Sequence, residues 1–215
     1  MTIWAIIPVK PPRDSKSRLA HILSAAERAE LTIHLFSNTL QVLKRSQTIA
    51  RTLVISRDPA VLKLARQANA LTYGEGDRPQ ELNLAITRAA HIAAAQQATG
   101  VLVLPADLPF ITVEDVQMMT AAALPAAGQP SGNGYYHKGR CMAICTDHNE
   151  DGTNALLVCP PTGFTFQYGP GSYQRHLDEA RRLGMPYRVI HALGLKFDVD
   201  TEADWETYKA MTGVR

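Results

Sequence analysis

Residues 101–109 read Val-Leu-Val-Leu-Pro-Ala-Asp-Leu-Pro, and this stretch decides the fold that we expect. The continuous apolar run 101–104 has the length and character of a buried strand, and Asp107 follows in the loop just after it. Open α/β sheets bind ligands outside the carboxyl ends of their strands. Asp107 is therefore a candidate ligand-binding residue at the edge of such a sheet.

Strand and helix patterns alternate through the first half of the chain. Strands are expected at 3–7, 52–55, 71–73 and 101–104, and helices after Ser24, at Pro59, from about Asn83 and after Thr112. Ser24 and Glu27 have the spacing of a capping box, and a Gly-rich turn is expected at 74–77. This β-α-β-α-β-α-β succession predicts a three-layer α/β fold with a largely parallel sheet and right-handed crossovers.

The pattern changes in the second half. Residues 127–139 hold Gly, Pro, Ser and Asn without periodicity, which predicts a loop or flap and the only candidate for an internal boundary. Strands are expected at 141–145 and 155–158. They would extend the sheet and make it mixed but still mostly parallel. We also expect a helix capped by Ser172, a strand at 187–190 and a terminal helix capped by Thr201, all within one domain, 1–215.

Composition favours a globular protein that handles a small ligand. The chain has 215 residues, of which 46% are hydrophobic and 20% charged, so a substantial core is expected. A net charge of +2 argues against nucleic acid as a partner, although basic residues gather early, at Lys10, Arg13, Lys16 and Arg18. No apolar stretch reaches membrane-spanning length, and three cysteines without a C-x-x-C unit indicate reduced thiols. These features predict a cytoplasmic protein without a membrane partner.

Asp198 and Asp200 close a second short apolar run. Being two residues apart in an extended segment, they would point the same way, as ligands that converge on one cation must. Together with Asp107 they predict a divalent metal. Mg2+ is held by a few carboxylates plus substrate phosphates, so a phosphorylated substrate is also expected. The alternative is that each Asp is only a turn or cap residue.

The segment from Lys10 to Leu19 follows the first strand and carries several cations. Its backbone amides and basic side chains could bind a triphosphate, and the alternative is a solvated basic loop. It is neither a Walker A loop nor a G-x-G-x-x-G loop, which disfavours those two nucleotide folds.

Segments 151–154 and 168–172 place glycine beside a hydroxyl, and the helix after Ser172 would offer free amides to a phosphate or carboxylate. The alternatives are an ordinary turn and an ordinary cap.

Asn83 could bind a base edge or cap its helix. Arg175 and His176 are expected to face solvent, with contact to a substrate carboxylate as the alternative, and no histidine spacing indicates zinc.

Six strings occur in order across nearly the whole chain: IIPVK (6–10), SKSRL (15–19), LPADLP (104–109), DGTNALL (151–157), YGPGSY (168–173) and FDVDT (197–201). This ordered set resembles the guanylyltransferases that activate 2-phospho-L-lactate or phosphoenolpyruvate in making coenzyme F-420. The resemblance implies a single Rossmann-like domain of the GT-A nucleotidyltransferase type. It also implies GTP as donor, Mg2+ as cofactor and a phosphoanhydride product.

The resemblance also implies residue roles. Asp107, Asp198 and Asp200 would hold the metal and act in catalysis with Lys16, whereas Thr153, Gly169 and Ser172 would hold the phosphorylated acid. Lys10, Lys16 and Arg18 would face the triphosphate, and Asn83 would lie near guanine, although Glu81 stands where the family has Gly. The nucleotide part would be about 1–125 and the acceptor part about 140–215, and segment 127–140 receives no functional residue.

Two rivals stay open at this point. A molybdenum-cofactor or sugar-phosphate nucleotidyltransferase should begin with a Gly-Gly-rich loop, but this chain has Pro-Val-Lys at 8–10. A catalytically silent, nucleotide-binding subunit would bind GTP without releasing pyrophosphate. The acceptor could be phosphoenolpyruvate, 2-phospho-L-lactate or 3-phospho-D-glycerate, and an apolar sheet edge in the second half would favour a homodimer.

Overall fold

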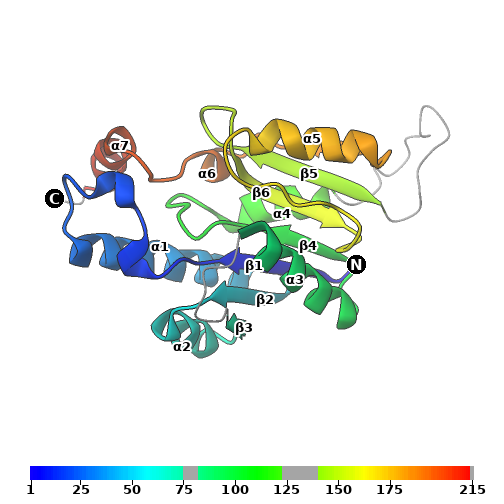
Figure 1. Cartoon of the computed structure of the whole chain (residues 1–215), viewed down its shortest axis with the longest axis horizontal. Coiled ribbons are helices and arrows are strands. Elements are labelled where there is room, and N and C mark those ends of the chain that lie inside the picture. Colours follow the sequence, from blue (N-terminus) through cyan, green and yellow to red (C-terminus); the bar gives the residue numbers. More distant parts are fainter. Residues whose placement is uncertain (75–81, 123–139, 214–215) are drawn as a thin grey trace.

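A mixed sheet organises the computed structural model, which describes residues 1–74, 82–122 and 140–213. Within these residues the sheet has seven strands in the order β3-β2-β1-β4-β6-β5-β7 (Figure 1). The strands are β1 Ile3–Pro8, β2 Ile49–Ser56, β3 Leu71–Gly74, β4 Gly100–Val103, β5 Cys141–Thr146, β6 Thr153–Cys159 and β7 Tyr187–Val189. Strands from both halves of the chain therefore belong to one sheet.

The first four strands are parallel, as the alternating pattern predicted. β1 pairs with β2 and β4, and β2 pairs with β3. The helices that connect or follow these strands are α1 Ala25–Arg45, α2 Pro59–Gln67, α3 Leu82–Ala95 and α4 Val113–Ala121. Parallel pairing brings the carboxyl ends of β1, β2 and β4 to one edge of the sheet, where the loops that follow them meet.

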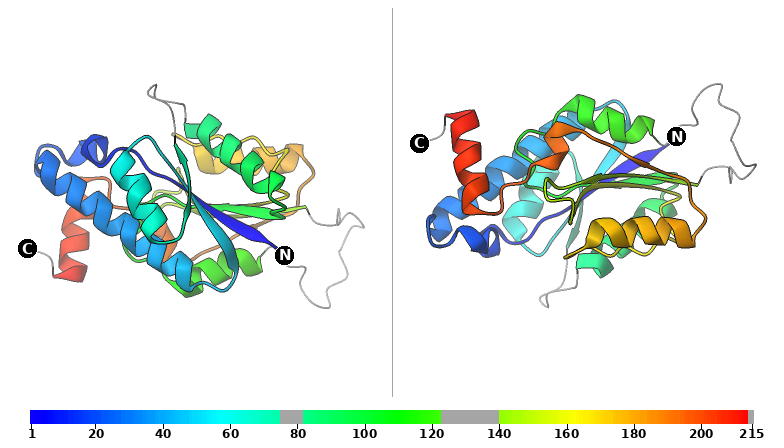
Figure 2. Two further views of the ribbon diagram at one scale, coloured as in Figure 1. Left: turned by 90° about the horizontal axis from the view of Figure 1, so that it is seen from below. Right: turned by 90° about the horizontal axis from the view of Figure 1, so that it is seen from above.

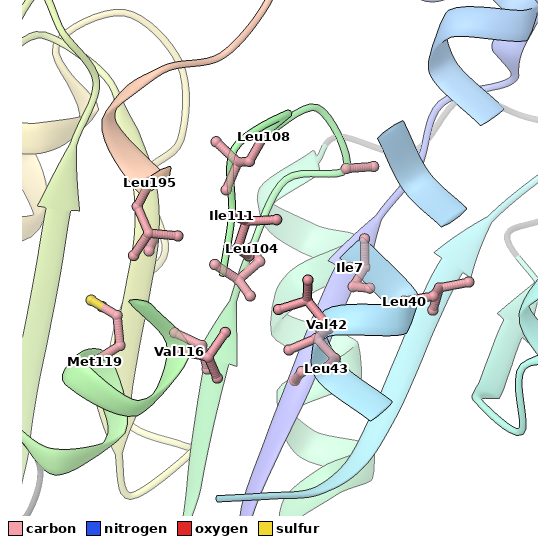
Figure 3. Packing of buried hydrophobic residues seen from close by; sticks show 14 of the residues in the cluster. Ile7, Leu40, Val42, Leu43, Leu104, Leu108, Ile111, Val116, Met119 and Leu195 are labelled. Atoms are coloured by element: carbon pink, nitrogen blue, oxygen red, sulfur yellow. The ribbon is translucent and has the colours of Figure 1, made fainter. Parts of the chain in front are cut away.

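Helices cover both faces of the sheet, which confirms the predicted three layers (Figure 2). Alternate residues of β1 point to opposite faces, so Ile7 packs with α1, α2 and α4, whereas Ile6 packs with α3 and α5. Figure 3 shows the first of these clusters, in which Leu43 of α1 and Val116 of α4 lie over the sheet. Two apolar interfaces of this kind make the sheet a rigid support for the loops at its edge.

The second half adds antiparallel strands, as expected, but next to β4 in the middle of the sheet. β6 is antiparallel to both β4 and β5, and β7 joins β5 in parallel. Three helices complete this half: α5 Ser172–Arg182, α6 Leu193–Lys196 and α7 Glu202–Thr212. Val103 pairs with Leu156, so the amino end of β6 lies beside the carboxyl end of β4. Thr153 therefore begins β6 at the edge where Asp107 lies.

Most of the predicted caps are confirmed. Capping boxes are present at Ser24, Thr112 and Thr201, and the Asp58 side chain accepts bonds from the first amides of α2. The prediction for Ser172 was wrong. Gly171 is the cap of α5, with φ 69 in the left-handed region that glycine adopts without strain, and Ser172 is the first helical residue.

Some of the expected features lie outside the described residues. These are most of the turn at 74–77, Glu81 and the loop 127–139. The edge strand β7 is only three residues long, and its exposed residues are Tyr187, which is 37% exposed, and the charged Arg188. The homodimer stays a prediction. Among the described residues, no helix is long and apolar enough to cross a membrane.

Candidate functional site

Two adjoining pockets lie at the carboxyl edge of the parallel strands. The larger has a volume of about 740 Å³ and the smaller about 200 Å³. Both are lined by Asp107 from the loop after β4 and by Asp200 from the segment before α7. Pro8, Leu82 and Pro105 also line both pockets. A molecule in one pocket would therefore lie against the same two carboxylates as a molecule in the other.

The basic segment after β1 lines the larger pocket. It contributes Lys10, Lys16 and Arg18, the residues expected to face a triphosphate, and forms two short 3-10 turns, Pro12–Asp14 and Ser17–Leu19. Arg57 lines this pocket too, and its Nη2 lies 2.7 Å from Oδ2 of Asp14. Arg57 was not among the residues expected at the site, although it follows β2 directly and its position after a parallel strand could have indicated it.

Lys16 is buried between the loops that form the two pockets. Only 8% of it is exposed, and its ammonium lies 3.3 Å from Asp107 Oδ2 and donates to the carbonyl of Val199. Its backbone is left-handed, with φ 53, which is uncommon for a residue with a side chain. Two contacts, one to the loop after β4 and one to the segment before α7, thus hold this cation beside Asp107, at the border between the pockets.

The three predicted acids come to this border. Asp200 Oδ2 lies 2.7 Å from Arg18 Nη1, and Asp198 Oδ1 accepts a hydrogen bond of 3.2 Å from Asn154 Nδ2. Burial, and then the negative charge of Asp107, raise the pKa of Asp198 to about 6, with a smaller contribution from Asp200. The carboxylates are close enough to interact, which the sequence could only suggest.

The same acids do not form a closed ligand set. In the described parts of the chain, no three His, Cys, Asp or Glu side chains are arranged to hold a metal ion. Asp107 and Asp200 are paired with cations, and Asp198 is bonded to an amide. Carboxylate oxygens nevertheless suit a hard divalent cation, and such a cation would neutralise the negative charge that Asp107 and Asp200 bring close to Asp198.

The smaller pocket is lined by Thr153, Asn154 and Tyr168 in addition to the acids. Thr153 Oγ1 lies 3.0 Å from Nδ1 of His176, and the backbone amide of Gln167 donates to Nε2 of His176 over 2.9 Å. Burial lowers the pKa of His176 to about 4. A hydroxyl, an amide and a phenol ring therefore line this pocket together with the carboxylates, and the amide of Asn154 is bonded to Asp198.

The expectation that His176 faces solvent was wrong, because its side chain is fully buried. Leu177 and Ala180, which are one and four residues further along α5, are buried as well, and helical spacing of this kind could have revealed the buried face. Arg175 is half-buried and its Nη2 donates to the carbonyl of Gln167 over 3.0 Å.

Asn83 lines neither pocket. Its Oδ1 accepts from the backbone amide of Tyr168 over 2.6 Å, and its Nδ2 donates to the carbonyl of the same residue over 3.2 Å. Its side-chain amide therefore holds the chain at Tyr168, a role that the two alternatives from sequence, base contact and helix cap, did not include.

Gly169 and Ser172 also line neither pocket, and Ser172 is only 2% exposed. The amide of Gly171 donates to the Asp151 carboxylate over 3.0 Å, and those of Ser172 and Tyr173 donate to backbone carbonyls. The expectation of free amides in the helix after Ser172 was thus wrong for the amide of Tyr173, and the amides of Gly171 and Ser172 just before it are bonded as well.

Comparisons with known proteins show the family and the type of fold. The family model described as "Guanylyl transferase CofC like" matches residues 3–208. The chain belongs to this family. As a CofC-like guanylyl transferase it is an enzyme of the nucleotidyltransferase class, which confirms the resemblance drawn from the six ordered strings.

One curated relative of this CofC-like protein is the phosphoenolpyruvate guanylyltransferase of Rubrobacter xylanophilus, with 38% identity over 100% of this chain and 97% of the relative. A nucleotidyl transferase from Methanothermobacter thermautotroptrophicus has a TM-score of 0.67, with 11% identity, over 98% of this chain and 97% of that one. Glucosyl-3-phosphoglycerate synthase from Mycobacterium tuberculosis, in complex with Mn2+, uridine diphosphate and phosphoglyceric acid, has a TM-score of 0.53, with 14% identity, over 87% and 68%. These structures confirm the nucleotidyltransferase type of fold.

Proposed function

We propose that the protein transfers GMP from GTP to phosphoenolpyruvate or 2-phospho-L-lactate and releases pyrophosphate, as a step of coenzyme F-420 assembly. One observation carries the proposal: the two pockets share the carboxylates of Asp107 and Asp200. Transfer between two substrates needs such a border, because reacting atoms must lie within about 3–3.5 Å of each other. The relative named a phosphoenolpyruvate guanylyltransferase supports this acceptor.

The larger pocket is the proposed donor site. Lys10, Lys16 and Arg18 line it and would bind the triphosphate, whose charge they complement. The volume of about 740 Å³ suits a nucleotide, since small-molecule pockets commonly measure about 300–1,000 Å³. Asn83 has no support as the base-reading residue, because its amide is bonded to Tyr168.

The smaller pocket is the proposed acceptor site. Thr153 lines it and is 7% exposed, so its hydroxyl is the best-supported contact to the phosphorylated acid. Gly169 and Ser172 follow Tyr168 in the chain, and their contact with the acceptor rests on the family resemblance alone. A Thr153→Val change should therefore raise the acceptor KM more than Ser172→Ala does.

The chemistry follows from the charges. A phosphate oxygen of the acceptor attacks the α-phosphorus of GTP, a new P–O bond forms, and the bond to the departing pyrophosphate breaks. The attacking oxygen is already ionised near neutral pH, so no general base is required, and the main obstacle is repulsion between two polyanions. Lys16 and Arg18 lower that repulsion from the donor side, and Thr153 orients the acceptor.

We further propose that Asp107, Asp198 and Asp200 hold Mg2+. When bound there, a divalent cation would neutralise charge on the reacting phosphates. All three carboxylates line the smaller pocket, which supports this assignment, as does the Mn2+ complex of a protein with a similar fold. None of the three cysteines, all in the described part of the chain, forms a disulfide, which fits a reducing compartment, and we propose that the reaction takes place in the cytoplasm.

The proposal is tested by incubating the protein with GTP, Mg2+ and each of phosphoenolpyruvate, 2-phospho-L-lactate and 3-phospho-D-glycerate. We expect pyrophosphate release and a product that mass spectrometry identifies as the acid joined to GMP. An Asp198→Asn variant should be inactive, whereas Asp178→Asn, on the exposed side of α5, should retain activity. Binding of GTP without pyrophosphate release would instead identify a silent subunit, and release only with a sugar phosphate or a molybdenum-cofactor precursor would identify another enzyme of this fold.

A further inference from the structure

A chain of hydrogen bonds links the smaller pocket to the interior of the protein. The backbone amide of Gln167 donates to Nε2 of His176, and Nδ1 of the same ring lies 3.0 Å from Oγ1 of Thr153. Thr153 lines the pocket, whereas His176 is completely buried behind it. The ring is hydrogen-bonded to the pocket lining through the hydroxyl of Thr153, and it packs against the ring of Tyr168, which lines the pocket as well.

These contacts determine which ring nitrogen carries the proton. A backbone N–H can only donate, so Nε2 must accept and cannot bear a hydrogen. Burial keeps the ring neutral near neutral pH by lowering the pKa of His176 to about 4. A neutral ring with a bare Nε2 carries its proton on Nδ1, and that N–H must donate to Thr153.

The direction of the Thr153 hydroxyl follows from the same reasoning. Its oxygen accepts from Nδ1 of His176, so its own proton must point elsewhere. No second partner for Oγ1 is present within residues 1–74, 82–122 and 140–213, and the side chain lines the pocket. The hydroxyl therefore offers a donor to whatever occupies the pocket, and it favours an oxygen that can only accept, such as that of a phosphate or carboxylate.

The surroundings hold the ring in this orientation. The rings of Tyr168 and Phe164 lie 4.9 Å and 5.9 Å from it, centre to centre. Gln167 is held in turn, since its carbonyl accepts from Arg175, and the backbone of Tyr168 is bonded on both sides by Asn83. The amide that sets the tautomer is thus itself fixed by α3 and α5.

We propose that His176 is a positioning residue, which directs the hydroxyl proton of Thr153 toward an anionic oxygen of the phosphorylated acceptor. This inference rests on the proposed function. It names what the smaller pocket favours at the position beside Thr153: an acceptor oxygen, above all an anionic one, rather than a group that can only donate, such as an ammonium. It also gives a function to the histidine that the sequence placed at the surface.

Two variants of His176 separate its two hydrogen bonds. His176→Asn places an amide near the position of Nδ1 and can still donate to Thr153, whereas His176→Gln reaches toward the position of Nε2 and can still accept from Gln167. Each variant loses one buried hydrogen bond, so the two should be destabilised to a similar extent. A difference between their KM values therefore does not come from a difference in stability. We expect His176→Gln to raise the acceptor KM about tenfold, as removal of one hydrogen bond to a charged group does, with the KM for GTP unchanged. The acceptor KM of His176→Asn should stay within about threefold of wild type.

Thr153 provides the second half of the test. Thr153→Val should raise the acceptor KM by about the same factor as His176→Gln, and Thr153→Ser should restore it. The double variant with His176→Gln should be no worse than Thr153→Val alone, because His176 acts through that hydroxyl. Independent, multiplying effects of the two changes would overturn the proposal.

The tautomer can be measured without activity. A proton–nitrogen correlation spectrum of labelled histidine should show the proton of His176 on Nδ1, with the signal identified by its loss in His176→Asn. A proton on Nε2, or equal effects of the Asn and Gln variants on the acceptor KM, would refute the role of His176. Absence of pyrophosphate release by the wild-type protein with all three acids would instead refute the proposed function.

Discussion

Buried His176 should make the stability of the protein depend on pH in a defined window. Burial lowers its pKa from 6.5 to about 4, so the unfolded chain takes up this proton as the pH falls through 6.5 and the folded protein does not until about 4. Between these values the unfolded state binds more protons, and the free energy of unfolding falls as the pH falls. Between about pH 7 and about pH 5 the loss from His176 alone is about 2 kcal/mol.

Asp198 works in the opposite direction over the same window. Its pKa is raised from 3.8 to about 6, so the folded protein binds this proton first and becomes more stable as the pH falls. The gain is about 1 kcal/mol between about pH 7 and about pH 5, which offsets part of the loss from His176. The pH dependence of the wild-type protein alone is therefore too shallow to test either group.

A comparison with His176→Asn isolates the histidine. Urea unfolding in metal-free buffer at the two pH values gives the free energy of unfolding for each protein. We expect the stability advantage of wild type over His176→Asn to shrink by about 2 kcal/mol on going to about pH 5. An advantage that stays constant within about 0.5 kcal/mol would refute the assignment of a neutral, buried ring. Asp198→Asn should show the opposite trend and serves as the control.

Three further predictions follow from the site and the fold. Asp107→Asn and Asp198→Asn should each abolish GTP turnover with an unchanged circular dichroism spectrum, and wild-type rates in either folded variant would remove the metal assignment. Lys16→Met should lower kcat/KM for GTP about a hundredfold in steady-state kinetics, because the buried ammonium lies at the border of the pockets, and Lys10→Met, on an exposed side chain, should cost less than about tenfold. Gly194→Ala should lower the free energy of unfolding by about 2 kcal/mol or more, because a Cβ there would overlap the carbonyl of Phe110 and the carboxylate of Asp115. Gly74→Ala is its control, since that Cβ would meet only Leu62 at an ordinary 3.7 Å, and equal stability of the two variants would contradict the close packing of α6.

Local patterns in the sequence were sufficient for most of the fold. Buried strands were identified by continuous apolar runs, and the helix starts at Ser24, Thr112 and Thr201 by side chains that bond the first amides. The position of Asp107 at the site followed from the rule that ligands bind beyond the carboxyl ends of parallel strands. These features depend on residues close together in the chain, and for that reason a sequence pattern can reveal them.

The acceptor side of the site depended on tertiary structure. Thr153 lies near Asp107 because β6 is inserted antiparallel beside β4, a pairing between segments about 50 residues apart that periodicity cannot predict. The burial of His176 and the bonding of the Gly171 amide to Asp151 depend likewise on which segments pack against α5. The sequence by itself determined the elements and the acids that the site would use. Only the folded chain decided which polar groups face one another, because each hydrogen bond needs two partners and the second comes from a distant segment.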